Sequence, residues 1–249
     1  MKMIKKNGYN ICFTLIVLIL AAMPLLLMNG VVKSTLVLYL GKCISFAIVA
    51  IGLDLIWGYT GILSLGHGLY FCLGAYGMGM YLKMVETHGK ITDFMQVGGL
   101  TELPLIWKPF LTMPGTLLMI FLVPAIVSGL IGYFIFKNRV KGVYFSIISQ
   151  ALTWAAYSIF IALSPYTNGN VGISQIQSVL GSLRGPKNES NLIVLFYVAL
   201  VILIVIYGFS YFLVHTKFGK LLIAIRDGEN RTYFSGYCVS KYKNFIYVL

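Results

Sequence analysis

Six long apolar runs constrain this sequence of 249 residues more than any other feature. A helix needs roughly 20 mainly apolar residues to cross the hydrocarbon core of a bilayer. No run shows the strict alternation of a membrane barrel strand, and only helices satisfy their own backbone groups in lipid one segment at a time. The sequence therefore predicts an all-α integral membrane protein with six transmembrane helices. The predicted spans are residues 11–28, 36–57, 60–82, 116–136, 143–163 and 192–214.

Composition supports this class. Charged residues make up only 10% of the chain, whereas soluble domains carry roughly 25%. This excludes a soluble, disordered or fibrous protein. The net charge is +12, but the basic residues flank the apolar runs, which is typical of cytoplasmic loops. The pattern indicates no nucleic-acid partner.

The first run follows three lysines, a layout shared by signal peptides and first membrane helices. The run is long and an A-x-A cleavage site is missing, which favours a retained span over a cleaved signal. Placing the N-terminus in the cytoplasm puts twelve basic residues inside, on segments 1–10, 57–60, 137–142 and 215–243, and six outside. The excess of Lys and Arg on cytoplasmic loops supports this orientation.

Ionisable and nucleophilic residues within the spans are few. Four scattered cysteines show no metal-ligand spacing, and the sequence predicts no metal site, no cofactor and no catalytic residues. Asp54 is the only carboxylate in an apolar run, and a capping or anchoring role is favoured for it. A membrane-embedded enzyme with Asp54 and His67 as an acid/base pair is the alternative. Because no phosphate-binding loop of the G-x-x-x-x-G-K-[ST] type is present, ATP hydrolysis would need another subunit.

The span 60–82 is rich in glycine. Two interpretations are open: close helix packing, or a broken helix beside a translocation path. Its Ser64, Gly66, His67 and Gly68 are candidate lining residues of such a path. His67 is either a substrate contact or a histidine bonded to a neighbouring backbone carbonyl.

The segment 215–243 is too polar to span a membrane, yet it carries helical periodicity in two short pieces. Leu221, Leu222 and Ile225 form an apolar stripe, and Asp227 with Gly228 separates it from a second piece that ends near Gly236. The pattern predicts a short helix pair at the membrane surface, of which an ordinary interfacial helix is one interpretation.

Residues 218–237 contain the pattern G-x4-A-I-R-D-x-E-x-R-x4-G-Y. This pattern resembles the ATPase-docking loop in permease subunits of ABC importers for branched-chain amino acids and urea. The resemblance covers nearly the whole chain and implies one permease domain over residues 1–249, with 215–243 as a cytoplasmic coupling-helix loop. It implies ATPase-coupling roles for Gly219, Ala224, Arg226, Asp227, Glu229, Arg231 and Gly236.

Residues 53–57, 103–110 and 141–153 look more like the urea branch, so urea is the leading substrate and a branched-chain amino acid the alternative. Gln150 and Thr153 are further candidates for polar lining. The resemblance implies a bacterial inner-membrane protein that works with a second homologous permease, two cytoplasmic ABC ATPases and an external substrate-binding protein. Residues 244–249 look like the first turn of a seventh helix, where family members continue with further spans. This predicts an incomplete version of a longer permease, with a nonfunctional fragment as another interpretation.

Overall fold

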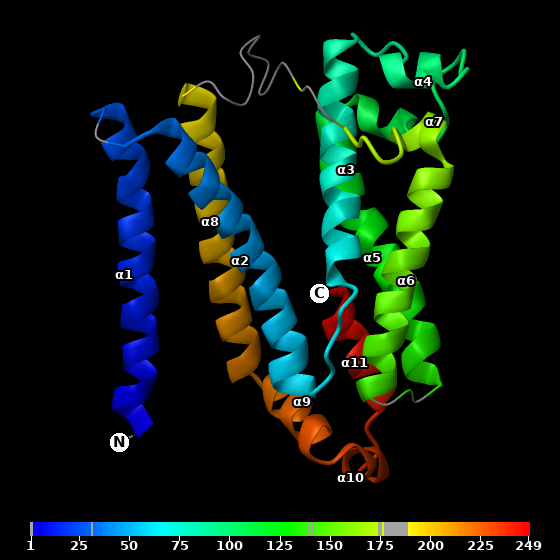
Figure 1. Ribbon diagram of the computed structural model, residues 1–249. Helices are drawn as coiled ribbons and strands as arrows, with labels where there is room; N and C mark the ends of the chain where they lie inside the picture. The colour runs from blue at the N-terminus through cyan, green and yellow to red at the C-terminus, as the bar shows by residue number, and fades with distance from the viewer. Residues whose placement is uncertain (1, 31, 139, 141, 174–175, 177–188) are drawn as a thin grey trace. The chain divides into compact units, whose positions relative to one another are not determined.

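The computed structural model describes residues 2–30, 32–138, 140, 142–173, 176 and 189–249 (Figure 1). Across these ranges the chain is helical and has no strand, which confirms the all-α class. The helices are α1 (Lys2–Met28), α2 (Ser34–Thr60), α3 (His67–Glu86), α4 (Asp93–Val97), the 3-10 helix η1 (Lys108–Leu111), α5 (Met113–Lys137), α6 (Gly142–Ala162), α7 (Ser164–Thr167), α8 (Glu189–His215), α9 (Lys217–Asp227), α10 (Glu229–Phe234) and α11 (Val239–Val248).

Among the described residues, five helices are long and apolar enough to cross a membrane: α1, α2, α5, α6 and α8. They correspond to five of the six predicted spans. The predicted span 60–82 is different, because residues 61–66 are not helical and α3 begins only at His67. α3 is 20 residues long, but its four glycines, Lys83 and Glu86 make it less apolar than the other five.

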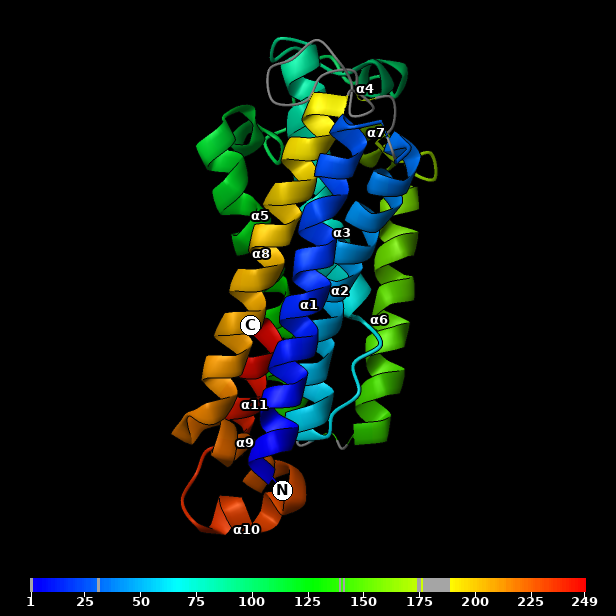
Figure 2. The ribbon, with the colours of Figure 1, turned by 90° about the vertical axis from the view of Figure 1, so that its left-hand side faces the viewer.

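Two compact units form the chain. The first comprises Met1–Ile51 and Val179–Tyr211, so the described part of it is α1, most of α2 and most of α8. Figures 1 and 2 show these three helices running side by side. Their shared core includes Val37 and Ile44 of α2 with Phe196 and Leu200 of α8, which are almost fully buried.

The second unit comprises Gly52–Ser178 and Phe212–Leu249. Its main core joins the end of α2 to α5, α6, α9 and α11, with Phe145 and Leu222 fully buried at its centre. A smaller core lies where α3 meets α4 and η1, around Met80, Met95 and Trp107. The main core includes Ile62 of the glycine-rich break and Leu222 of the helix pair, the two features singled out in the sequence.

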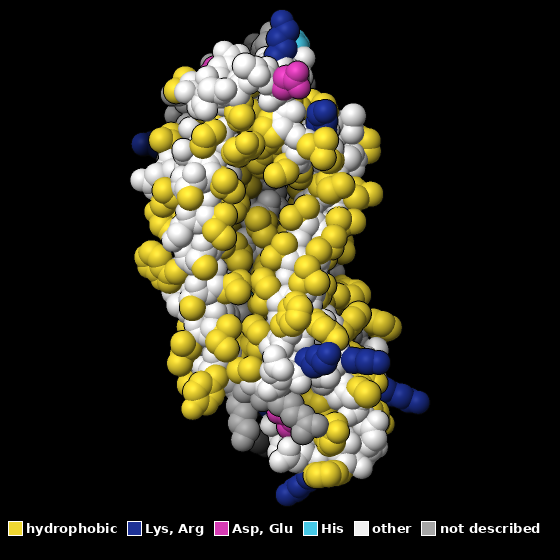
Figure 3. Space-filling model, turned by 90° about the vertical axis from the view of Figure 1, so that its right-hand side faces the viewer, with side chains coloured by type: hydrophobic (Ala, Val, Ile, Leu, Met, Phe, Trp, Pro, Cys, Tyr) yellow, Lys and Arg dark blue, Asp and Glu magenta, His cyan; other side chains and the backbone are white. Residues whose placement is uncertain are grey.

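Apolar side chains cover much of the second unit's surface. Figure 3 shows them over the middle of one face, while Lys and Arg side chains gather toward its two ends. Phe121 of α5 and Tyr144 of α6 are 76% and 67% exposed in the isolated chain. Water would make such exposure costly, whereas a bilayer's hydrocarbon accepts it. The surface is that of a membrane protein.

α11 corrects the prediction for the C-terminal part. A helix was expected to start near residue 244, but α11 begins at Val239 and includes Lys241 and Lys243. Its buried side chains Val239, Lys243, Ile246 and Tyr247 recur at helical spacing and define the face that packs inward. The last residues of the predicted loop 215–243 therefore belong to this helix.

Candidate functional site

The break after α2 is built around glycine and hydroxyl groups. Gly61 adopts a φ of 71°, a left-handed conformation that glycine takes without steric cost, and ends the helical path. Within residues 61–66, the Leu65 amide N–H donates to Ser149 Oγ at 3.1 Å, and the Leu63 carbonyl accepts from Ser146 Oγ at 2.6 Å. α6 thus supplies partners for backbone groups that a helix would have satisfied.

Ser64 and His67 meet at the end of this break. His67 Nδ1 lies 2.9 Å from the hydroxyl of Ser64, which is only 3% exposed. The described partner of His67 is thus a side-chain hydroxyl, whereas one sequence interpretation gave it a backbone carbonyl. The ring of His67 also packs edge-on against Tyr70 and Tyr247, at centroid distances of 5.9 and 5.5 Å.

Tyr70 and Tyr247 extend this cluster across the second unit. Their hydroxyl groups lie 2.6 Å apart and join α3 to α11. Tyr247 is buried among the apolar side chains of the main core. Ser64, His67, Tyr70 and Tyr247 therefore form a hydrogen-bonded and aromatic cluster that fixes the first turn of α3. Sequence reasoning missed both tyrosines, because 177 residues separate them.

A cavity of about 290 Å³ lies between α3, α6 and the residues that follow α7. Gly68 and Thr153, both predicted to line a path, are among its lining residues. Gly66 lies next to it, because a Cβ there would come within 3.0 Å of the Ser149 carbonyl and 3.4 Å of Thr153 Oγ1. Most of the lining is apolar: Leu69, Cys72, Leu73, Ala156, Phe160 and Ile161.

Not every residue predicted to line a translocation path lies at the break or the cavity. Gln150 is exposed, whereas its neighbour Ser149 is buried and faces the break. Ser146 and Ser149 bond the break directly, and the sequence analysis did not single them out. Ser146, Ser149 and Thr153 are separated by three and then four residues, which places them on one face of a helix. This spacing is the sequence signal that could have identified Ser146 and Ser149.

Ser149→Ala is expected to destabilise the protein by about 1 kcal/mol, since the Leu65 N–H would lose its partner. Thermal unfolding in detergent measures this effect. Ser158→Ala is the matched control, because that exposed hydroxyl only bonds the carbonyl of Trp154 in its own helix. Equal unfolding temperatures for the two variants would contradict the role given to Ser149.

The helix pair follows α8 (Figure 2). α9 ends at Asp227 and α10 runs over Glu229–Phe234, so the predicted break at Asp227 and Gly228 is confirmed. Leu222 and Ile225 are 0% and 2% exposed, so two members of the predicted stripe anchor α9. The Thr232 hydroxyl donates to the Ala224 carbonyl at 3.1 Å and holds α10 against α9.

The predicted coupling residues occupy several environments in this pair. Ala224, Asp227 and Arg231 line an open groove of about 580 Å³. Gly219 is buried, and Gly236 has a φ of 89° in the turn after α10.

Arg226 and Glu229 bond groups within the chain: Arg226 Nη1 donates to the Gly58 carbonyl at 2.7 Å, and Glu229 Oε1 pairs with Lys243 Nζ at 2.7 Å. Lys243 was missed, because a lysine in a basic polar segment gives no sign of burial.

Asp54 and His67, the acid/base pair of the enzyme alternative, contact different groups. His67 bonds Ser64, and Asp54 is exposed beside Gly58; no described hydrogen bond or ion pair joins them. Over the described ranges, no group of three or more His, Cys, Asp and Glu side chains is arranged to hold a metal ion.

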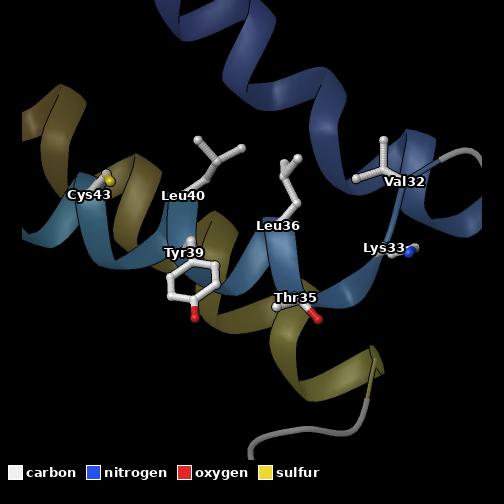
Figure 4. Close-up of a pocket in the computed structure, with 7 residues that line it drawn as sticks. All are labelled: Val32, Lys33, Thr35, Leu36, Tyr39, Leu40 and Cys43. Atoms are coloured by element: carbon white, nitrogen blue, oxygen red, sulfur yellow. The ribbon is translucent and has the colours of Figure 1, made fainter.

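An open groove of about 540 Å³ lies in the first unit along the start of α2 (Figure 4). Its lining is mainly apolar, with Lys33 as the single charged residue. The groove contains none of the predicted path or coupling residues.

Comparison with known proteins assigns the family. The family described as "Branched-chain amino acid transport system / permease component" matches residues 35–249. The chain belongs to this family. Comparison with the curated proteins and with the solved structures gives no significant match.

As a permease component of this branched-chain amino acid type, the chain is a transport protein with several membrane-crossing helices. The family match covers α2, apart from its first residue, and every later helix of the second unit. It therefore includes both the break at 61–66 and the pair α9–α10.

Proposed function

We propose that this chain is the path-forming permease subunit of an ATP-driven ABC importer, in which α9 and α10 dock on a cytoplasmic ATPase. The pair α9–α10 is the observation that carries the proposal. Its apolar side is anchored in the core by Leu222 and Ile225, while Ala224, Asp227 and Arg231 remain around an open groove. The importer would contain a second homologous permease, two ATPases and an external substrate-binding protein.

Contacts within the second unit support the proposed orientation. The predicted cytoplasmic segments 57–60, 137–142 and 215–243 lie near one another: Arg226 bonds Gly58, and a Cβ on Gly142 would lie 3.6 Å from the Gly61 carbonyl. Loops on one side of a membrane must be able to meet in this way. We place this side and the N-terminus in the bacterial cytoplasm, with α3 as a sixth crossing in the inner membrane.

Urea is the substrate we propose, carried past Ser64, Gly66, His67, Gly68 and Thr153. Urea is neutral and rich in hydrogen-bonding groups, so hydroxyls and free backbone groups suit it better than charges do. The hydroxyls of Ser64 and Thr153 are of this kind, whereas the Leu65 N–H and the Leu63 carbonyl of the break already bond α6. Gln150 would contribute only if its exposed side chain faces the partner permease.

A branched-chain amino acid is the second candidate, favoured by the apolar lining of the cavity beside Gly68. The aliphatic side chain of such an amino acid fits an apolar lining, whereas urea has no aliphatic group. Uptake of labelled urea and labelled leucine by cells with the complete importer, with and without this chain, tests both. Urea uptake that depends on the chain supports the first candidate, and leucine uptake that depends on it supports the second. If the chain affects the uptake of neither solute, the proposed import function is contradicted.

Gly236→Arg tests the docking role. A side chain at Gly236 is expected to strain its left-handed turn and shift α10, lowering recovery of the ATPase by about tenfold. Co-purification of the ATPase with the tagged permease gives the measurement. Gly228→Ala is the control, since φ there is −164° and a Cβ meets only ordinary contacts. Unchanged ATPase recovery with Gly236→Arg would count against the docking role.

A further inference from the structure

The side chain of Arg226, in the last turn of α9, contacts the last turn of α2. Figure 1 shows the ribbons of these two helices. Its Nη1 donates to the Gly58 carbonyl at 2.7 Å, and its Nε lies 3.0 Å from Asp227 Oδ1. The final carbonyls of a helix lack partners within the helix and carry partial negative charge, so a guanidinium is well suited to bind them. Arg226 therefore caps α2 from a separate helix.

The cap lies where the chain leaves α2 for the non-helical residues 61–66. A Cβ on Gly61 would come within 3.0 Å of Arg226 Cγ, so the arginine stem passes directly over this residue. Gly61 has the left-handed φ that ends the helical path, and Ser64 and His67 follow within six residues. Arg226 thus contacts the point from which the break departs.

Apolar packing between α9 and α2 alone does not fix the direction in which one helix moves the other. Leu222 of α9 shares the main core with Leu55 and Ile56 of α2, which keeps the two helices together. Such contacts tolerate sliding, whereas a hydrogen bond from a charged group to a carbonyl fixes a direction.

We propose that Arg226 is a positioning residue that transmits movement of α9 to the break at 61–66 through the Gly58 carbonyl. The proposal rests on the proposed docking of α9 and α10 on an ATPase, and it assigns Arg226 to the permease interior rather than to the ATPase contact. Movement of α9 would then pull the end of α2 and change the position of Ser64 and His67.

The test is Arg226→Met in the complete importer, which removes the guanidinium but keeps a long apolar side chain. Lys241→Met, which removes an exposed cation from α11, is the matched control. Three quantities are measured: ATPase co-purification, solute uptake, and maleimide labelling of Leu65→Cys with and without ATP. The labelling uses a background in which the four native cysteines are replaced by alanine. Leu65 is 50% exposed and lies within the break, so its labelling reports on the position of 61–66.

Arg226→Met is expected to keep ATPase recovery near the wild-type level while uptake falls about tenfold or more, the size of one lost charged hydrogen bond. Labelling of Leu65→Cys is expected to respond to ATP in the wild type and in Lys241→Met, but not in Arg226→Met. Arg226→Lys should restore part of the response, because an ammonium can also donate to a carbonyl.

Normal uptake and a normal ATP response in Arg226→Met would overturn this proposal and leave the docking role intact. Loss of ATPase recovery in correctly folded Arg226→Met would also overturn it, since Arg226 would then be a docking contact. If the wild type itself recovers no ATPase, the proposed function fails instead.

Discussion

Gly219→Val is expected to prevent α9 from following α8 in its present turn and to cost about 3 kcal/mol of stability. Gly219 is buried, and a Cβ there would collide with the backbone carbonyl of Val214. A backbone atom cannot rotate away as a side chain does, so the turn itself must open. Because α9 is part of the main core through Leu222, the disturbance reaches α2 and α6 as well.

The measurements are the yield of monodisperse protein in detergent and its unfolding temperature. Gly208→Val is the control, because Gly208 lies in the preceding helix α8 and a Cβ there meets nothing within 4 Å. We expect that control to behave like the wild type and Gly219→Val to lose both stability and ATPase recovery. Similar behaviour of the two variants would show that the turn adapts, and that Gly219 has a role other than close backbone approach.

The close approach at Gly219 gives one predicted coupling residue a different role. The sequence pattern grouped Gly219 with Asp227 and Arg231 as docking residues. The structure buries Gly219 in the first turn of α9 and places the other two around an open groove. A motif records which residues occur together and does not distinguish those that shape a segment from those that remain available to a partner.

Local signals were sufficient for much of the fold. Apolar length alone located α1, α2, α5, α6 and α8, because each crossing must bury its own backbone in lipid. Asp227 with Gly228 located the break between α9 and α10 for a similarly local reason. The break after α2 was harder to predict, since several glycines are compatible both with tight packing and with a non-helical segment. The hydrogen bonds of Ser146 and Ser149, which lie on another helix, to residues 61–66 favour the non-helical segment.

Contacts between distant parts of the chain could not be predicted in this way. The Tyr70–Tyr247 hydrogen bond depends on how α11 packs against α3 and α5, and no pattern within either segment encodes it. The start of α11 was missed for the same reason, because its polar first half looked like loop. Only the burial of Val239 and Lys243 reveals that this half already belongs to the helix.

Lys243 leads to the second prediction with a large effect. Its side chain is 8% exposed and pairs with Glu229, which is 44% exposed, at 2.7 Å. The lysine end of this ion pair is therefore buried, whereas water reaches the glutamate end. Glu229→Gln leaves a buried cation with only a neutral partner, and we expect a loss of roughly 2 kcal/mol, below the value for a fully buried pair. Lys243→Met leaves a carboxylate that water can still reach, so its cost should stay under about 1 kcal/mol.

A double-mutant cycle separates this pair from other effects. Glu229→Gln combined with Lys243→Met should recover most of the stability lost in Glu229→Gln, with a coupling of about 1 kcal/mol or more between the two sites. Unfolding temperature in detergent gives the stabilities, and ATPase co-purification is followed in parallel. If Glu229 acts only by holding α10 against α11, Lys243→Met should lower ATPase recovery as Glu229→Gln does, because it removes the same ion pair. If recovery is normal in Lys243→Met but low in both variants that lack Glu229, Glu229 itself contacts the ATPase and the ion pair is not the reason it is needed.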